Sequence, residues 1–295
     1  MTDKKKKTSL CVTSMKGGTG KTTLALNIAE YFATKMERVL IIDLDPQSHS
    51  CLYFTSEETL LDKNQIRLLD ILKFIINNVA DVYENSPTTM ATLRNLFLRS
   101  LVHRDNLSVV ASSPDVSEIE SQIIVAGTTS AYTVGNTPTT YLLPVLIRMA
   151  HETYDMVIID CPPTITLELV RSAYIGVRNI LIPTDPTKFG YNGLEKAYQW
   201  YLKAKKLFNP GLNLAGIVMT RYDVRKMVHR AVMEAIEENK DFVRALLKPP
   251  LPYLADYEKS GHLNQYVVTY NPRDKAAKVF LELMANLEGR LVYEQ

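Results

Sequence analysis

Residues 11–30 read CVTSMKGGTGKTTLALNIAE, which is an apolar run, a glycine-rich segment and a helix-forming segment in succession. The apolar run favours a strand, and the segment that starts at Lys21 favours a helix. Glycines let backbone N–H groups point into a concave nest for phosphate oxygens, and a helix N-terminus adds partial positive charge. This strand–loop–helix order is the context that a phosphate-binding loop, or P-loop, requires. The stretch therefore predicts an α/β nucleotide-binding fold.

Apolar runs elsewhere in the chain alternate with segments of helical period. The expected strands are SLCVTS from Ser9, RVLIID from Arg38, LSVVAS from Leu107, DMVIID from Asp155, RNILIP from Arg178 and LAGIVM from Leu214. Most of these runs are continuously apolar, which is typical of strands buried on both faces. Together they predict a mostly parallel twisted sheet flanked by helices, that is, a P-loop NTPase fold.

We expect one domain over residues 1–295. Helices are expected at about 21–35, 114–124, 139–151, 190–206, 224–240 and 275–291, with further helices between about 55 and 104. The segment AGTTSAYTVGNTPTT from Ala126 is rich in Thr and Gly and is interpreted as a surface loop. Fewer than ten residues precede the first strand, so no N-terminal helix-turn-helix domain is expected.

The composition favours a globular protein with an anionic partner. Hydrophobic residues make up 46% of the 295, and the net charge is +2. From Lys196 onward, however, 16 lysines and arginines face 11 aspartates and glutamates. The three cysteines offer no disulfide framework and no CxxC metal site, which favours a reduced, cytoplasmic protein. No apolar run approaches the roughly 20 residues that span a bilayer, so no membrane partner is expected.

The glycine-rich loop supplies the expected nucleotide ligands. Lys21 is predicted to reach the β and γ phosphates, and the Thr22 hydroxyl to ligate Mg²⁺. The remaining loop positions predicted to bind ATP are Gly17, Gly18, Thr19, Gly20 and Thr23. The usual pattern G-x-x-x-x-G-K-[ST] has a glycine where this chain has Met15, and Lys16 is a cation that the pattern does not explain.

The sequence KGGTGKTT resembles the deviant Walker A box of the ParA/MinD ATPase family. This resemblance implies that Lys16 crosses a homodimer interface and contacts the partner's ATP, as a catalytic and nucleotide-binding residue. Its physical logic is that of an arginine finger, in which a second charge stabilises the transferring phosphoryl group. The alternative is that Lys16 is an ordinary solvated lysine.

Three aspartates follow apolar strands. Asp43 and Asp45 lie in VLIIDLDPQ, and Asp160 ends MVIID. A carboxylate after a buried strand is costly unless it meets a cation, and alternation is expected to direct Asp43 and Asp45 to the same side. The resemblance implies that Asp45 orients or deprotonates the attacking water, and that Asp160 holds Mg²⁺ through a water. Asp43 is expected either to support Mg²⁺ or Lys21, or to cap the following turn.

Further segments extend the resemblance to nearly the whole chain, and it is weakest between Thr55 and Arg104. VVASSPDVSEIE, ILIPTDPTKFG and GIVMTRYDVRKMVHRAV resemble later strand–loop–helix segments of the family. By this resemblance Thr220 and Arg221 are expected near adenine.

Among family members, the chain resembles a small DNA-partitioning ATPase. Iron–sulfur relatives need cysteine pairs that are missing here, and the tail KVFLELMANLEGRLVYEQ carries only Arg290 against three glutamates after Lys278. That tail therefore favours a helix packed on the domain over a MinD-like membrane anchor. A MinD-like membrane-surface positioning ATPase and a nucleotide-switched scaffold that carries no DNA remain the alternatives.

A partitioning ATPase would bind non-specific double-stranded DNA and associate with the nucleoid. A ParB-like centromere-binding protein would stimulate its ATP hydrolysis. Non-specific binding needs lysines and arginines rather than a reading helix. Within the expected helix 224–240 and the residues before it, Arg221/Arg225 and Lys226/Arg230 have i,i+4 spacing. The full set of expected DNA contacts is Lys205, Lys206, Arg225, Lys226, Arg230, Arg244 and Lys248. The alternative for each cluster is an ordinary solvated helix face.

Overall fold

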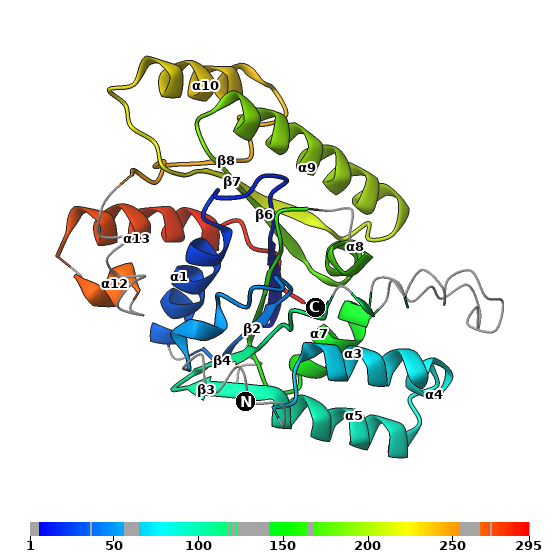
Figure 1. Ribbon diagram of the computed structural model, residues 1–295. Coiled ribbons are helices and arrows are strands. Elements are labelled where there is room, and N and C mark those ends of the chain that lie inside the picture. Colours follow the sequence, from blue (N-terminus) through cyan, green and yellow to red (C-terminus); the bar gives the residue numbers. More distant parts are fainter. Residues whose placement is uncertain are drawn as a thin grey trace.

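The computed structural model describes residues 6–35, 37–55, 65–116, 118–119, 122, 142–164, 168–253, 266–271 and 273–294. Within these residues the chain forms an eight-stranded sheet with the order β3-β4-β2-β5-β1-β6-β7-β8 (Figure 1). Neighbouring strands are parallel except β3, which is antiparallel to β4. The predicted mostly parallel sheet is confirmed.

The strands include all six that the sequence predicted. They are β1 Thr8–Val12, β2 Val39–Asp43, β3 Leu101–Arg104, β4 Leu107–Val110, β5 Met156–Asp160, β6 Asn179–Thr184, β7 Asn213–Met219 and β8 Leu246–Leu247. The strands that the sequence did not predict, β3 and β8, lie at the two edges of the sheet. β3 has the sequence LVHR, whose last two residues are polar and exposed, and β8 has only two residues, so neither carries a long apolar run.

The helices flank the sheet. They are α1 Lys21–Thr34, α3 Leu68–Asn77, α4 Val79–Tyr83, α5 Pro87–Ser100, α7 Leu142–Ala150, α8 Glu168–Gly176, α9 Lys188–Leu207, α10 Met227–Glu238, α12 Val267–Tyr270 and α13 Lys275–Glu288. The helices expected at 21–35, 139–151, 190–206 and 275–291 are present, and α3 to α5 form the helices expected between 55 and 104. The expected loop 126–140, and much of the helix 114–124, lie outside the described residues.

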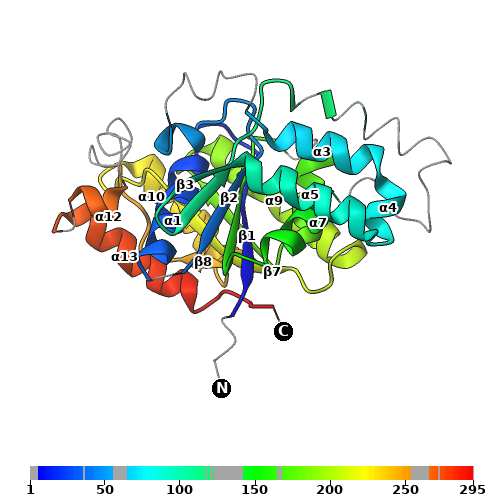
Figure 2. The ribbon, with the colours of Figure 1, turned by 90° about the horizontal axis from the view of Figure 1, so that it is seen from below.

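The helices form two layers, one on each face of the sheet (Figure 2). The two layers bury alternate residues of the same strands. Leu10 and Ile41 face the cluster that contains α1, α12 and α13. Cys11 and Ile42 face the opposite cluster, which contains α3, α5, α7, α8 and α9. Burial on both faces explains why the central strands are continuously apolar. It also leaves the ends of the strands as the place for polar chemistry.

The prediction for the segment before α10 was wrong. The helix begins at Met227 rather than Val224, so Arg221, Arg225 and Lys226 precede it. Asp223 explains the delay, because its carboxylate accepts the backbone N–H of Arg225 at 3.1 Å and its carbonyl accepts that of Lys226. Such local side-chain hydrogen bonds compete with helix formation. The expected i,i+4 pairs therefore do not form helix faces.

Asn179 connects β6 to its surroundings on the side away from the P-loop. Its amide nitrogen donates to Thr8 Oγ1, to the Ser9 carbonyl and to the Val292 carbonyl at 2.9–3.1 Å. Its Oδ1 accepts from Asn213 and from the backbone N–H of Val292, both at 2.9 Å. One fully buried amide thus links β1, β6, β7 and the residues after α13.

Asn179→Asp should lower the free energy of unfolding by about 1–3 kcal/mol, because a carboxylate cannot donate to the two carbonyls and is buried. In a chain of this size each ~1 kcal/mol corresponds to about 2–4 °C in Tm, which thermal denaturation would detect. Asn95→Asp, at an exposed position of α5, is the matched control and should leave Tm within about 1 °C of the wild-type value. Equal Tm values for the two variants would contradict this role for Asn179.

Candidate nucleotide and metal site

The P-loop connects the end of β1 to α1. Gly18 and Gly20 have φ angles of +74° and +80°, a left-handed conformation that glycine adopts without steric cost. A Cβ atom placed on Gly17 or Gly20 would meet nothing within 4 Å, so these two positions border open space. The backbone therefore has the open glycine turn, followed directly by a helix N-terminus, that a bound phosphate group needs.

Lys21, the first residue of α1, is buried at the base of this loop. Its side chain Nζ donates to the Lys16 carbonyl at 3.3 Å, and the residue is only 7% exposed. Burial lowers the pKa of Lys21, while the negative charges of Asp160 and Asp45 act in the opposite direction. A buried ammonium group is suited to bind a phosphate, and the nearby carboxylates favour its charged form.

Asp43 and Asp160 end two neighbouring strands and are paired in register. Both are buried, and burial raises the pKa of each carboxyl group, that of Asp160 to about 6. The Thr22 and Ser50 hydroxyls and the charge of Lys21 oppose the shift at Asp160. Ser50 joins the two carboxylates, because its backbone N–H donates to Asp43 at 3.2 Å and its hydroxyl to Asp160 at 3.0 Å.

The two carboxylates differ in how they are satisfied. Asp43 accepts the backbone N–H of Asp45 at 2.9 Å through its other oxygen, so both of its oxygens hold the loop 44–50. This matches the turn-capping alternative for Asp43. Asp160 Oδ1, in contrast, is buried without a hydrogen-bond partner among the described residues. That oxygen and the neighbouring Thr22 hydroxyl are the hard oxygen ligands that Mg²⁺ prefers, so the residues fit this ion.

Asp45 lies beyond the end of β2 and is half-buried. A turn rather than strand alternation therefore orients it: its carboxylate accepts the backbone N–H of Gln47 at 3.0 Å. The sequence analysis expected strand alternation to direct Asp43 and Asp45 to the same side. That reason was wrong, because the strand ends at Asp43 and Asp45 lies outside it.

Thr220 and Arg221, expected near adenine, lie against the P-loop. The Thr220 hydroxyl is within hydrogen-bond distance of the Thr19 and Thr184 carbonyls, at 3.0 and 3.1 Å. A Cβ on Gly18 would be 3.6 Å from the Arg221 guanidinium, and Arg221 itself has a φ of +54°. The residue after Thr220 thus places a cation beside the glycine turn.

Lys16 makes its contacts within its own chain. Its ammonium group forms an ion pair with Asp185 and donates to Thr187 Oγ1 at 3.0 Å. Sequence reasoning did not predict Asp185, Thr187 or Ser50 as parts of the site. The TDPT and DPQSHS segments show only polar residues after a strand, and that signal does not reveal their partners.

The expected DNA-binding residues have different surroundings. Arg225 forms two hydrogen bonds with Asp223, both at 2.9 Å, and Lys248 pairs with Glu237 at 2.7 Å. Arg230 donates to the Val224 carbonyl at 2.8 Å. On the last turns of α9, exposed lysines contact aromatic rings instead: Lys203 lies 4.7 Å from the centre of Trp200, and Lys205 lies 5.7 Å from that of Tyr201.

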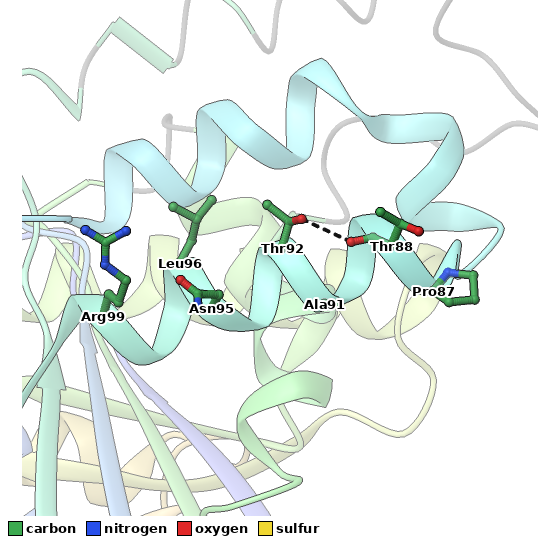
Figure 3. Close-up of a pocket in the computed structure, with 7 residues that line it drawn as sticks. All are labelled: Pro87, Thr88, Ala91, Thr92, Asn95, Leu96 and Arg99. Carbon is green, nitrogen blue, oxygen red and sulfur yellow. Dashed lines mark hydrogen bonds between the residues drawn. The ribbon is translucent and has the colours of Figure 1, made fainter.

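A separate groove runs along the outer side of α5 (Figure 3). It is lined by Pro87, Thr88, Ala91, Thr92, Asn95, Leu96 and Arg99. Helix α5 packs on the opposite face of the sheet from α1, and the lining contains no carboxylate or histidine. We assign the groove no part in nucleotide chemistry.

Residues 7–214, which contain the P-loop and the three aspartates, match a family described as an AAA domain, AAA_31. The chain belongs to the AAA_31 family. The resemblance to ParA-type ATPases is thereby confirmed, and the match of this AAA_31 chain to a chromosome partitioning protein ParA from Myxococcus xanthus agrees with it. The two are 24% identical over 284 residues, which are 95% of this chain and 88% of the relative.

Solved structures share the fold of this AAA_31 chain. An ATP complex of a McdA variant from Cyanothece has a TM-score of 0.75 at 17% identity, and the match covers 97% of this chain and 98% of that one. A cobyrinic acid a,c-diamide synthase from Mycobacterium smegmatis, with bound ADP and magnesium, has a TM-score of 0.70 at 20% identity. That match covers 98% of this chain and 99% of the other.

Replacement by asparagine should affect the stability of the protein differently at the two buried aspartates. Asp43→Asn puts an amide N–H₂ against one of two backbone N–H donors and should lower stability by about 1–3 kcal/mol. Asp160→Asn should not lower stability at pH 7, because the folded-state pKa of about 6 lies above the ordinary 3.8. Ionisation of Asp160 therefore costs stability as the pH rises through that window. Chemical denaturation of both nucleotide-free variants tests this, and equal losses would contradict it.

Proposed function

We propose that this protein is an ATP-hydrolysing partitioning ATPase that works on DNA. The observation that carries the proposal is the meeting of buried Lys21, the open glycine turn and the carboxylates of Asp43 and Asp160 at the end of the sheet. This arrangement supports binding of ATP with Mg²⁺. The partitioning role is supported by the similarity to the Myxococcus xanthus ParA.

The residues divide the chemistry among them. The P-loop N–H groups and Lys21 hold the β and γ phosphates, while Thr22 and Asp160 hold Mg²⁺, which neutralises the phosphate charge. Asp45, half-buried and within electrostatic reach of Lys21, orients the attacking water. Asp43 holds the loop that carries Asp45 and Ser50. Because positioning and charge do most of the work, the intrinsic hydrolysis rate is slow.

ATP binding assembles a homodimer in which Lys16 reaches the partner's nucleotide. The face next to Lys16 carries apolar side chains in contact with solvent. Phe189 is 75% exposed, and Met227 and Val228 are 74% and 60% exposed. Met227 and Val228 line a groove between α9 and α10, and Phe189 is the neighbour of its lining residue Lys188. Large exposed apolar side chains of this kind are typical of protein–protein interfaces.

The dimer binds DNA without sequence preference through exposed cations. We place the main contacts on the last turns of α9, because Lys203, Lys205 and Lys206 are all exposed there within four positions of one another and none of them has an ion pair within the described residues. Arg225 and Lys248 are each paired with a carboxylate, so they contribute less. Arg230 and Arg244 add secondary contacts.

A ParB-like centromere-binding protein stimulates hydrolysis and releases the dimer from DNA, so the protein is cytoplasmic and associated with the nucleoid. The MinD-like alternative depends on a membrane-binding C-terminal helix. Helix α13 instead buries Phe280, Leu283 and Leu287 against the sheet. Within the described part of the chain, no helix has the length and apolarity to cross a bilayer.

Two substitutions should separate ATP binding from hydrolysis. Lys21→Ala should abolish ATP binding, because the buried phosphate site loses its cation. Asp45→Ala should bind ATP with near-normal affinity but lose roughly 100-fold or more in turnover, because water orientation is not needed for phosphate binding. Fluorescent-ATP binding and phosphate release measure the two steps. Normal ATP affinity in Lys21→Ala, or normal turnover in Asp45→Ala, would refute the assignment.

Charge reversal should identify the DNA surface. Lys203→Glu, Lys205→Glu and Lys206→Glu together should weaken binding to random duplexes more than Arg225→Glu, Lys226→Glu and Arg230→Glu together. Wild-type affinity should also fall steeply with salt, because each neutralised phosphate releases counterions. Fluorescence anisotropy with ATP at several salt concentrations measures both effects. A salt-insensitive affinity, or binding of anionic liposomes rather than DNA, would reject DNA as the partner.

A further inference from the structure

We propose that Asp185 is a positioning residue that holds Lys16 within its own chain, and that Lys16 leaves Asp185 when two ATP-bound copies associate. This inference rests on the proposed function, in which Lys16 contacts the partner's nucleotide. It adds a residue, Asp185, whose charge sets how readily that contact forms.

The first observation is the set of contacts at the Lys16 ammonium group. The group pairs with Asp185 and donates to Thr187 Oγ1 at 3.0 Å. The side chains of Lys16 and Asp185 are 29% and 12% exposed, so the ion pair is largely shielded from water. Two of the three ammonium donors are therefore committed within the chain.

The second observation is that the acceptors are held in place. Thr187 donates its hydroxyl to Asp185 at 3.0 Å and accepts the backbone N–H of Gly190 at the same distance, which caps the start of α9. A Cβ on Gly190 would lie 2.1 Å from the Asp185 carboxylate, so this close approach requires glycine. The Asp185 carboxylate is thus fixed by the turn between β6 and α9.

The third observation is the course of the Lys16 side chain beside α9. A Cβ on Gly193 would lie 3.6 Å from the Lys16 Cβ, so the lysine runs close along the first turns of that helix. An ammonium group engaged with Asp185 and Thr187 cannot also make its full set of bonds to a phosphate on another molecule. Dimer formation must therefore exchange the Asp185 carboxylate for a phosphate as the anionic partner of Lys16.

Asp185→Asn isolates this effect. The side-chain oxygen of the introduced asparagine still accepts from Thr187, so the turn is kept, while the charge that holds Lys16 is lost. We expect ATP-dependent dimers to form with a dissociation constant roughly three- to tenfold lower than in the wild type, as for loss of a partly exposed ion pair. Analytical ultracentrifugation with ATP in an Asp45→Ala background, which slows hydrolysis, measures it. Asp185→Ser serves as a second neutral variant if Asp185→Asn folds poorly.

The Lys16–Asp185 ion pair can also be tested in the nucleotide-free monomer, where no dimer is needed. Acetylation of Lys16 by an amine-reactive reagent, followed by peptide mass spectrometry, should be severalfold faster in Asp185→Asn than in the wild type. Exposed Lys196 on α9 is the internal control and should react equally in both. If Asp185 had only a structural role, its substitution would not change the acetylation rate of Lys16 relative to that of Lys196.

The outcomes separate the two proposals. If the wild type dimerises with ATP but Asp185→Asn changes neither the dissociation constant nor the Lys16 acetylation, this inference is wrong and the proposed function stands. If wild-type protein binds ATP and never dimerises, the proposed function fails and the inference fails with it. Lys16→Ala combined with Asp185→Asn should remain monomeric, and restored dimers in that double variant would also overturn the inference.

Discussion

The constraint on which this end of the molecule depends is the burial of two like charges, Asp43 and Asp160, at the ends of neighbouring strands. The sheet order puts β2 beside β5, and the register pairs the two aspartates. Desolvation disfavours their ionised forms, which is why the pKa of each is raised. Ser50 and backbone N–H groups compensate part of that cost, and Lys21 supplies the nearby positive charge. The part of the desolvation cost that these groups do not offset favours binding of a divalent cation between the carboxylates and the P-loop.

The two lysines of the P-loop, Lys16 and Lys21, lie in different environments. Lys21 is buried under the glycine turn, and burial lowers its pKa, so its charge is directed at whatever anion occupies the turn. Lys16, five residues earlier, is half-buried and forms an ion pair with Asp185. The same short segment thus carries one cation buried beneath the glycine turn and one cation that is paired with Asp185. Within the folded chain the extra lysine of the motif has a defined anionic partner.

Charge compensation also separates the basic surfaces. The sequence predicted DNA contacts both around α10 and at the end of α9. In the folded protein carboxylates neutralise Arg225 and Lys248, whereas the lysines at the end of α9 contact aromatic rings or solvent. A polyanion responds to the net local charge. Counting lysines and arginines along the sequence therefore does not show which of them are already paired with carboxylates.

The sequence by itself determined the strand–loop–helix of the P-loop, the six inner strands of the sheet and the aspartates at the ends of two of them. These are local signals: glycine at left-handed positions, apolar runs and a polar residue where each run stops. Only the tertiary structure decided that Ser50 joins Asp43 to Asp160 and that Asp185 pairs with Lys16. The Lys16–Asp185 ion pair links residues 169 positions apart, and Ser50 and Asp160 are 110 apart. Contacts at such separations depend on strand order and register, which no local pattern encodes.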